Sequence, residues 1–485
     1  MAGPGVTITT SVRTGPTNAQ LAATATMFVA GVTERGPDGT SHLITSIAEF
    51  EDVFGEKVSD GWTYQTVETF FEEGGSRAYV SRIVDDTAVE AILNLVDADT
   101  DTCAVLTAAG TGTWANTRLS AEVIQPSGST FKVKIKLDGA TVWTSSTHTD
   151  VSEFIDEVNN SSAAALYATA AADESSNIPA VQEDNFTGGT NGGTIGDDDL
   201  QDALDTFTNN LGPGAVCAPG FYSSAARTAL LAHAQENNRI AVMSFDKDTT
   251  VGDAIEEAAD FSTEANASYG SFFYPWVKIP NGTSLTQVVP PEGYVCGKRS
   301  KVHNLYGSWT PWAGEKTQAD FVTGVYSSLS KTDAGNLDDG NVNAIRVING
   351  TVRVYGARSL SSDTANYRFI IAREVLNQIT YEAEQALEAL LFLPIDGRRS
   401  TFARVGATLV GILDRIRIGG GLYEAFDAFG KQIDPGYTVQ VNDSNNPLDQ
   451  LASGKIKAKV GARVSSIGDK IEVEITKSNL TATLV

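Results

Sequence analysis

The sequence predicts an α+β protein of several domains: an α/β core built from N- and C-terminal parts, a middle α/β domain, a small β-rich insertion domain and extended terminal arms. Three observations predict this class. The 485 residues are too many for one hydrophobic core. The chain is 41% apolar and 20% charged, as folded proteins are. Its pattern changes from mixed helices and strands to short alternating strands, and then back again.

The net charge of −25 argues against general nucleic-acid binding, so we expect no direct contact with nucleic acid. The charge is also uneven. Residues 345–485 carry 17 basic and 15 acidic side chains, whereas the remaining residues carry 18 basic and 45 acidic ones. The two regions are therefore expected to face different surroundings, for example an acidic exterior and a locally basic contact surface.

Cysteine usage and hydropathy exclude several other classes. The three cysteines (Cys103, Cys217 and Cys296) lie far apart and form no CxxC motif. This argues against a disulfide framework or a zinc site and favours a reducing, intracellular compartment. The N-terminus lacks the pattern of a signal peptide, and no run approaches 18 apolar residues. We therefore predict no metal site and no membrane insertion. Because the sequence also lacks nucleotide-binding motifs, we predict no cofactor.

The first 20 residues are expected to be extended, because Val6 and Ile8 alternate with threonines between Gly/Pro pairs. Such a segment is either a frayed end or edge strand, or an arm that adds a strand to the sheet of another subunit. Residues 21–98 follow as a compact α+β unit, the N-terminal part of the core. We expect strands at 27–32, 42–45 and 78–84, and helices at 46–50 and 63–73.

Residues 99–187 are predicted to form the β-rich insertion domain. Period-two alternation marks strands at 118–124 and 131–137, a third strand follows at 141–144, and a short helix covers 151–158. A glycine-rich stretch at 188–194 ends the domain.

Residues 197–344 are predicted to form a middle α/β domain. Helices at 198–209, 224–237 and 250–260 alternate with strands at 215–218, 240–245 and 271–279. This βαβαβ order implies a largely parallel sheet with covering helices.

A parallel sheet raises the possibility of an enzyme centred on residues 197–333, because Asp246 follows a strand where α/β enzymes place function. The sequence contains no GxGxxG after a strand and no Walker motif. The four histidines (His42, His148, His233 and His303) show no metal or triad spacing. A carboxylate that caps a loop is the favoured interpretation of Asp246, and no catalytic residue is predicted.

Residues 345–469 hold the densest apolar pattern. We expect a half-buried helix at 374–392 that Pro394 ends, and a second helix at 400–418. The buried stripe of the second helix is predicted to comprise Phe402, Val405, Leu409, Ile412, Leu413 and Ile416.

Arginines mark the other side of this second helix. Arg404 and Arg415 lie about three turns apart and share a face, with the small residues Thr408 and Gly411 between them. Residues 395–418 hold two aspartates against five arginines: Arg398, Arg399, Arg404, Arg415 and Arg417. Taken alone, this pattern fits either a solvated helix face or a contact surface for an acidic partner.

The chain ends with two alternating segments, at 455–460 and at 470–475. Residues 470–485, with Ile471, Val473 and Ile475, are predicted to form a C-terminal arm. Exposed lysines on the first segment would protect an edge strand from unwanted pairing.

Several motifs resemble the contractile tail sheath family, which includes phage sheaths, R-type pyocins and related injection systems. In the N-terminal half they are GVTERGP (31–37), ITSIAEFEDVFG (44–55), FFEEGGSRAYVSRIV (70–84) and GTGTWANTRLSAEV (110–123). The strongest is PPEGYVCGKRSKVHNLYGSWTPWAGE (290–315), although Glu292 and Cys296 depart from the family pattern. Ile348-Asn349 followed by Tyr355-Gly356-Ala357-Arg358 resembles a further signature, with Gly350 and Tyr355 as departures. Residues 367–373 resemble the arginine-flanked strand that precedes the long helix of the family, so the resemblance implies a strand there.

The resemblance implies a structural subunit rather than an enzyme. Such a subunit polymerises as stacked hexameric rings in a helical array around an inner tail tube protein, with baseplate and tail terminator proteins as further partners. It contracts to drive the tube through a target cell envelope. It belongs to a virion tail or an injection-machine sheath and is assembled in the bacterial host cytoplasm.

The resemblance also assigns roles to two parts of the chain. A helix at 400–418 attaches each sheath subunit to an acidic inner tube, which makes the five arginines candidate tube contacts. The two terminal arms each donate a strand to the sheets of neighbouring subunits, and the β-rich insertion lies on the outside. Two alternatives remain: the α/β enzyme described above, and a non-contractile tube or coat protein.

Overall fold

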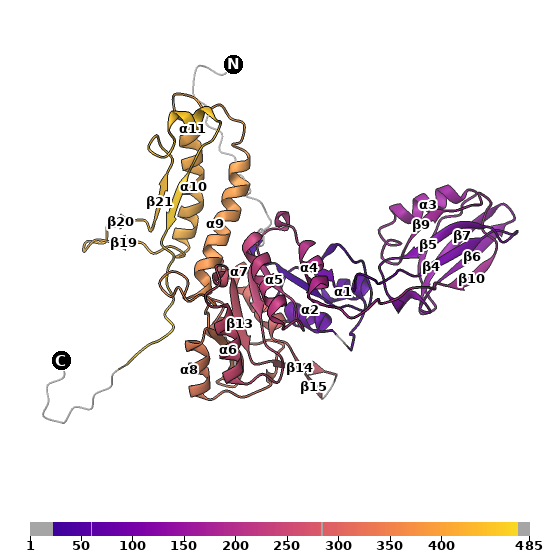
Figure 1. The fold of residues 1–485 in the computed structure, drawn as a ribbon, viewed down its shortest axis with the longest axis horizontal. Helices are drawn as coiled ribbons and strands as arrows, with labels where there is room; N and C mark the ends of the chain where they lie inside the picture. The colour runs from indigo at the N-terminus through magenta and orange to yellow at the C-terminus, as the bar shows by residue number, and fades with distance from the viewer. Residues whose placement is uncertain (1–22, 60, 283–284, 474–485) are drawn as a thin grey trace, which may run out of the picture.

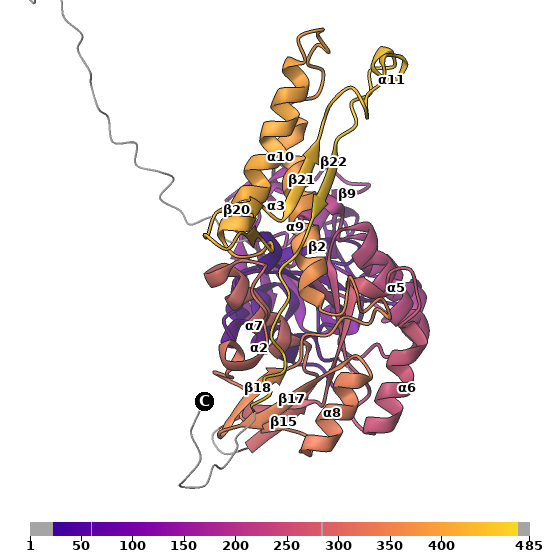
Figure 2. The ribbon, with the colours of Figure 1, turned by 90° about the vertical axis from the view of Figure 1, so that its left-hand side faces the viewer.

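The computed structural model describes residues 23–59, 61–282 and 285–473 (Figures 1 and 2). The predicted N-terminal arm, with Val6 and Ile8, lies outside the described residues. Of the predicted C-terminal arm, residues 470–473 are described, whereas Ile475 is not.

One eight-stranded sheet forms the centre of the molecule, in the order β18-β17-β13-β12-β11-β1-β3-β2. Neighbouring strands run parallel from β17 to β3, and the edge strands β18 and β2 are antiparallel. The predicted parallel sheet is therefore present. The strands are β1 (Met27–Gly31), β2 (Ser41–Ile44), β3 (Ala78–Arg82), β11 (Ala215–Cys217), β12 (Ile240–Met243), β13 (Gly270–Tyr274), β17 (Val342–Ile348) and β18 (Thr351–Tyr355).

This sheet corrects the predicted division of the core. The sequence places β1–β3 in an N-terminal part of the core, β11–β13 in a separate middle domain and β18 in the C-terminal core, but all of them share one sheet. The link is β1, which pairs with β11 so that Met27 faces Ala215. Local sequence patterns cannot reveal that two strands so far apart in sequence pair with each other. The alternation of apolar and polar residues identifies each strand but carries no information about its neighbour in the sheet.

Helices cover both faces of the sheet, each with its own buried apolar cluster. Serine or threonine side chains cap four of these helices by accepting a backbone N–H from the first turn: Ser46, Ser223, Thr250 and Ser330. One face carries α1 (Ile47–Phe54), α2 (Thr63–Glu72) and α7 (Glu292–Tyr306). The other carries α4 (Asp197–Asp205), α5 (Ser224–Glu236), α6 (Val251–Phe261) and α8 (Lys331–Asp339).

Helix α7 is buried along most of its length and ties distant parts of the chain together. Lys298 forms an ion pair with the fully buried Glu73 at 2.6 Å. Glu73 also accepts the backbone N–H groups of residues 320–322. Trp312 is 1% exposed and fills the core. The motif at 290–315 is thus largely a core helix and its buried loop.

The β-rich unit lies at one end of the molecule (Figure 1) and has a core of its own. It contains the sheets β10-β6-β7-β8 and β4-β5-β9. Its first strand precedes the predicted boundary at residue 99, because β4 pairs with β5. The elements are β4 (Ile92–Val96), β5 (Thr102–Ala108), β6 (Leu119–Ser127), β7 (Thr130–Leu137), β8 (Ala140–Thr144), α3 (Val151–Asn160), β9 (Ala168–Ala172) and β10 (Gln182–Asn185).

The C-terminal module lies on the opposite side of the central sheet (Figures 1 and 2). Its first helix contacts the amino-terminal edge of the sheet, where Asn377 donates a hydrogen bond to the carbonyl of Arg239, directly before β12. The β-rich unit instead follows the carboxyl end of β3. The elements of the module are α9 (Ile370–Glu388), α10 (Ser400–Ile418), β19 (Ala425–Phe426), β20 (Gln432–Asp434), β21 (Tyr437–Gln440), α11 (Leu448–Ala452) and β22 (Lys459–Ala462).

Two predictions for this module are wrong in detail, and a third is untested. The strand expected at 367–373 is largely the first turn of α9, since a short apolar run suits a helix or a strand equally. Helix α9 ends at Glu388, so Leu391 and Phe392 are exposed rather than half buried. Residues 470–473 pair with no strand in the described part of the chain, and their role as an arm that pairs with a neighbouring subunit stays a prediction.

The remaining elements are short. A three-stranded sheet contains β14 (Val277–Asn281), β15 (Leu285–Val289) and β16 (Gly324–Val325). The 3₁₀ helices are η1 (Ala23–Ala25), η2 (Thr113–Ala115), η3 (Asn209–Leu211), η4 (Ala267–Tyr269) and η5 (Gly314–Thr317).

Candidate functional site

Helix α10, which carries the predicted contact arginines, is defined at both ends by its sequence. Asp396 caps its start by accepting the backbone N–H of Ser400 at 3.0 Å and the Ser400 hydroxyl at 2.8 Å. These hydrogen bonds lower the pKa of the Asp396 carboxyl. The helix ends at consecutive glycines, of which Gly420 adopts a φ of +86° that favours glycine.

One side of α10 is buried much as the periodicity predicts. Phe402, Val405, Leu409, Leu413 and Ile416 are all buried, whereas Ile412 is only partly so. Its C-terminal half packs against α9 and against the sheet formed by β21 and β22. The helix is therefore held between a second helix and a small sheet, which fixes the direction of its outer face.

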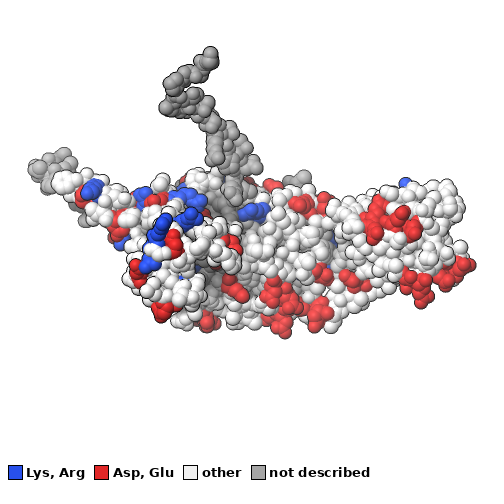
Figure 3. Space-filling model, turned by 90° about the horizontal axis from the view of Figure 1, so that it is seen from above, with Lys and Arg blue, Asp and Glu red and all other residues white. Residues whose placement is uncertain are grey.

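The outer face of α10 carries Arg404 and Arg415, as predicted from their spacing. Both are exposed, and the exposed residues between them include only small ones, Ala407 and Gly411. Arg415 retains 59% of its side-chain exposure. Basic side chains gather at this end of the molecule, whereas acidic ones dominate the β-rich end (Figure 3). A charged face beside small side chains allows another surface to approach the helix backbone closely.

The five predicted arginines are not equivalent. Arg399 pairs with Asp443 at 2.7 Å, and Arg415 pairs with Glu382 of α9. Arg417 pairs with Asp414 at 2.9 Å and with Glu424 at 2.6 Å, and its pKa is raised by these contacts. Within the described residues, Arg398 and Arg404 have no carboxylate partner. The sequence does not reveal this difference, because the partners lie on other elements.

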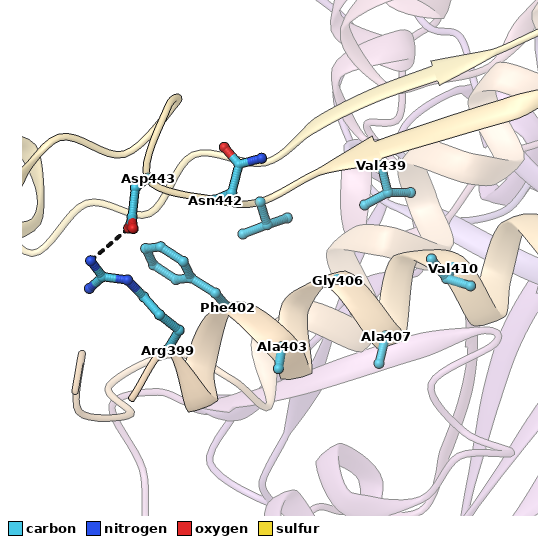
Figure 4. A pocket seen from close by; sticks show the side chains of 10 residues that line it. Arg399, Phe402, Ala403, Gly406, Ala407, Val410, Val439, Asn442 and Asp443 are labelled. Carbon is cyan, nitrogen blue, oxygen red and sulfur yellow. Dashed lines mark ion pairs between the residues drawn. The ribbon is translucent and has the colours of Figure 1, made fainter. Parts of the chain in front are cut away.

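A groove of about 420 Å³ runs between α10 and β21 (Figure 4). Small and apolar residues of α10 form its floor, and Val439 and Val441 form its other wall. The Arg399–Asp443 ion pair closes one end. The lining residues from α10 are Phe402, Ala403, Gly406, Ala407 and Val410.

Strands β21 and β22 form a two-stranded sheet, and no other described strand pairs with either outer edge. Arg463 donates its backbone N–H to the Gly436 carbonyl, and Tyr437 faces Ala462 in the ladder. Hydrogen bonding alternates along an antiparallel strand, so the backbone N–H and C=O of Tyr437 and Val439 point to the outer edge. This free edge lies directly beside the groove.

The predicted C-terminal arm residues Ile471 and Val473 are 88% and 75% exposed. They have no strand partner in the described part of the chain. An alternating apolar pair with free backbone groups is suited to pairing with a sheet edge.

The possible enzyme site lies elsewhere, in a crevice of about 960 Å³ at the carboxyl ends of β1, β3 and β11. The strand order reverses here, the position where α/β enzymes bind ligands. Arg82, which lines the crevice, donates hydrogen bonds at 2.9 Å to the carbonyls of Gly36 and Thr111. Burial lowers the pKa of Arg82 to about 10. This guanidinium therefore holds the connection to the β-rich unit against the core.

Two further observations bear on the enzyme alternative. Asp246 is exposed and accepts the backbone N–H of Asp248 at 3.2 Å, as expected of a loop cap. Among residues 23–59, 61–282 and 285–473, no three or more His, Cys, Asp or Glu side chains are grouped so that they could hold a metal ion. Within the same residues, no helix is both long and apolar enough to span a membrane.

Comparison with solved structures gives full-length matches. A chain of the PVC sheath complex in its contracted state, from an extracellular contractile injection system, has a TM-score of 0.58 at 15% identity, over 98% of this chain and 99% of that one. A chain of the contracted helical sheath of the anti-feeding prophage has a TM-score of 0.57 at 14% identity, over 99% and 100%. The chain has the contractile sheath fold.

A crystal structure supports the same assignment. The sheath tail protein from Listeria innocua matches with a TM-score of 0.62 at 14% identity, over 90% of this chain and 94% of that one. No family model and no curated protein matches the sequence. The resemblance seen in the motifs is thus confirmed by the fold.

Proposed function

We propose that the chain is a structural subunit of a contractile tail sheath. It polymerises as a helical array around an inner tube and contracts to drive that tube through a target envelope. The observation that carries this proposal is the sheath fold, matched over 98% of this chain by a subunit of a contracted injection machine. The machine is a virion tail or an injection system assembled in a bacterial cytoplasm, with baseplate and terminator proteins at its ends.

Self-association in this proposal uses the β21–β22 sheet as an acceptor. The arms at 1–20 and 470–485 of neighbouring copies each add a strand to a free edge. The groove beside β21 receives apolar side chains from one incoming strand. Each backbone hydrogen bond contributes about 0.5–1.5 kcal/mol, so a ladder of several bonds holds subunits together while other contacts change. Contacts of this kind do not close on themselves and build stacked rings in a helix.

Attachment to the tube in this proposal uses the outer face of α10. Arg404 is the central residue of this contact, because it is exposed and has no carboxylate partner in the described residues. Arg398 supports it at the start of the helix. Arg399, Arg415 and Arg417 already pair within the chain and contribute less. Arginine suits an acidic tube surface, since its charge does not titrate and it can bind carboxylates with two hydrogen bonds.

The Arg404→Glu variant tests the tube contact. The exchange replaces attraction to an acidic tube by repulsion, and we expect at least about a tenfold weaker co-sedimentation with tube protein, or 1.4 kcal/mol. The matched control is Arg417→Glu, which reverses a charge on the same helix. Because Arg417 already pairs with carboxylates of its own chain, this variant should lose less co-sedimentation with tube protein than the Arg404 variant. Unchanged co-sedimentation of the Arg404 variant would refute the assignment of α10 to the tube.

A further inference from the structure

The last described segment of the chain is held to the core near its end. Ser465 donates its backbone N–H to the Gly421 carbonyl at 3.0 Å as the chain leaves the C-terminal module. The segment then runs along the core toward β17, β18 and α8 (Figure 2). There the Asp469 carboxylate lies 3.0 Å from an Arg358 nitrogen and 3.7 Å from an Arg368 nitrogen.

Arg358 is a rigid partner for this carboxylate. Its side chain is 3% exposed, and it binds Asp338 of α8 through two hydrogen bonds of 2.7 and 2.6 Å. The ring of Phe369 lies against both guanidinium groups, 5.0 Å from that of Arg358 and 5.6 Å from that of Arg368. A guanidinium that donates two hydrogen bonds to one carboxylate and packs on an aromatic ring keeps a single orientation. The Asp469 carboxylate, which pairs with this guanidinium, is therefore held in one position.

Lys470 still lies 4.0 Å from the Asp338 carboxylate of α8, and the chain becomes exposed directly after it. Ile471 and Val473 are mostly exposed, with Glu472 between them. The described chain ends at the opposite end of the molecule from α11 and the tips of β21 and β22 (Figure 2). The segment therefore points away from the free sheet edges of its own C-terminal module, and a second copy of the chain must supply the edge that it joins.

We propose that Arg358 and Arg368 anchor Asp469, so that residues 471–473 leave the core in a fixed direction as the start of a strand donated to a second copy of the chain. This inference rests on the proposed sheath function. The two arginines are positioning residues. A fixed exit direction raises the effective concentration of the strand at the neighbouring sheet edge, and a loose one lowers it.

The test uses the Asp469→Asn variant, which removes the charge at nearly constant shape. Spin labels on Thr332→Cys and Glu472→Cys report the distance from α8 to the segment, since the three native cysteines are buried. Asp449→Asn is the matched control, because Asp449 is exposed and has no ion pair within the described residues. We expect a narrow distance distribution in the parent and the control, and a broad one in the Asp469 variant.

Polymer growth, followed by light scattering, is the second measurement. We expect growth of the Asp469 variant to slow at least about threefold, and that of the control to stay unchanged. If the distance distribution of the Asp469 variant is unchanged, Asp469 does not anchor the segment. If the distribution broadens but the polymer grows normally, the anchor has no role in strand donation. Failure of the parent chain to polymerise at all would instead overturn the proposed function, and strand donation with it.

Discussion

Replacing Arg299 with methionine is expected to lower the free energy of unfolding by about 3–5 kcal/mol. Arg299 of α7 binds Glu374 of α9 through hydrogen bonds of 2.6 and 2.7 Å, and both side chains are 1% exposed. It also donates to the Thr24 carbonyl at 2.5 Å. The substitution leaves the Glu374 carboxylate buried without its counter-charge. Burial already raises the pKa of Glu374, which shows how costly its charge is there.

Two control variants distinguish the effect of breaking the buried Arg299–Glu374 pair from the effect of removing any positive charge from α7. Lys301→Met removes a lysine from the same helix, but its partner Asp320 is half exposed, so we expect a loss of at most about 1 kcal/mol. The double variant Arg299→Met/Glu374→Met should recover most of the stability, because an apolar pair replaces both charges. Denaturant titration followed by tryptophan fluorescence measures all three. A loss below about 1 kcal/mol in the single Arg299 variant would contradict this account.

The Val439→Pro variant is expected to abolish polymer growth while the monomer remains folded. Proline removes the backbone N–H that points to the free edge of β21, and its ring obstructs an incoming strand. The hydrogen bonds between β21 and β22 use the alternate residues, so the variant spares them. We expect the concentration needed for polymer formation to rise at least about tenfold, or 1.4 kcal/mol.

Val439→Ala is the matched control for this variant. It removes most of the side chain from the groove and keeps the backbone donor. If backbone pairing drives assembly, the alanine variant should polymerise nearly as the parent does. Sedimentation of serial dilutions gives the critical concentration of each protein. Equal effects of proline and alanine would place the contribution of Val439 in side-chain packing and refute the free edge as an acceptor.

The sequence predicts those parts of the structure that depend on short-range pattern. The buried stripe of α10 follows from apolar spacing, and the shared face of Arg404 and Arg415 follows from helix geometry. The parallel order of β11, β12 and β13 follows from alternation of helices and strands.

Long-range pairing could not be predicted. Nothing near Phe28 or Val216 indicates that their strands lie side by side. The pairing of Arg415 with Glu382 depends on how α9 and α10 pack, so five arginines of one sequence pattern differ in the structure. Arg358 and Asp469, which form a contact, are more than one hundred residues apart in the sequence. The Gly-Ala-Arg motif marks Arg358 as notable, but nothing in the sequence indicates that Asp469 is its partner.

Cryo-electron microscopy of the purified chain, assembled with and without tube protein, tests the central claim most directly. We predict hollow helical cylinders in which α10 lines the inner wall, the β-rich unit of β4–β10 lies on the outer surface, and a strand from a neighbouring copy lies along the edge of β21. Cylinders with α10 on the outside, or particles that remain single subunits under all conditions, would contradict the assignment of this chain as a sheath subunit.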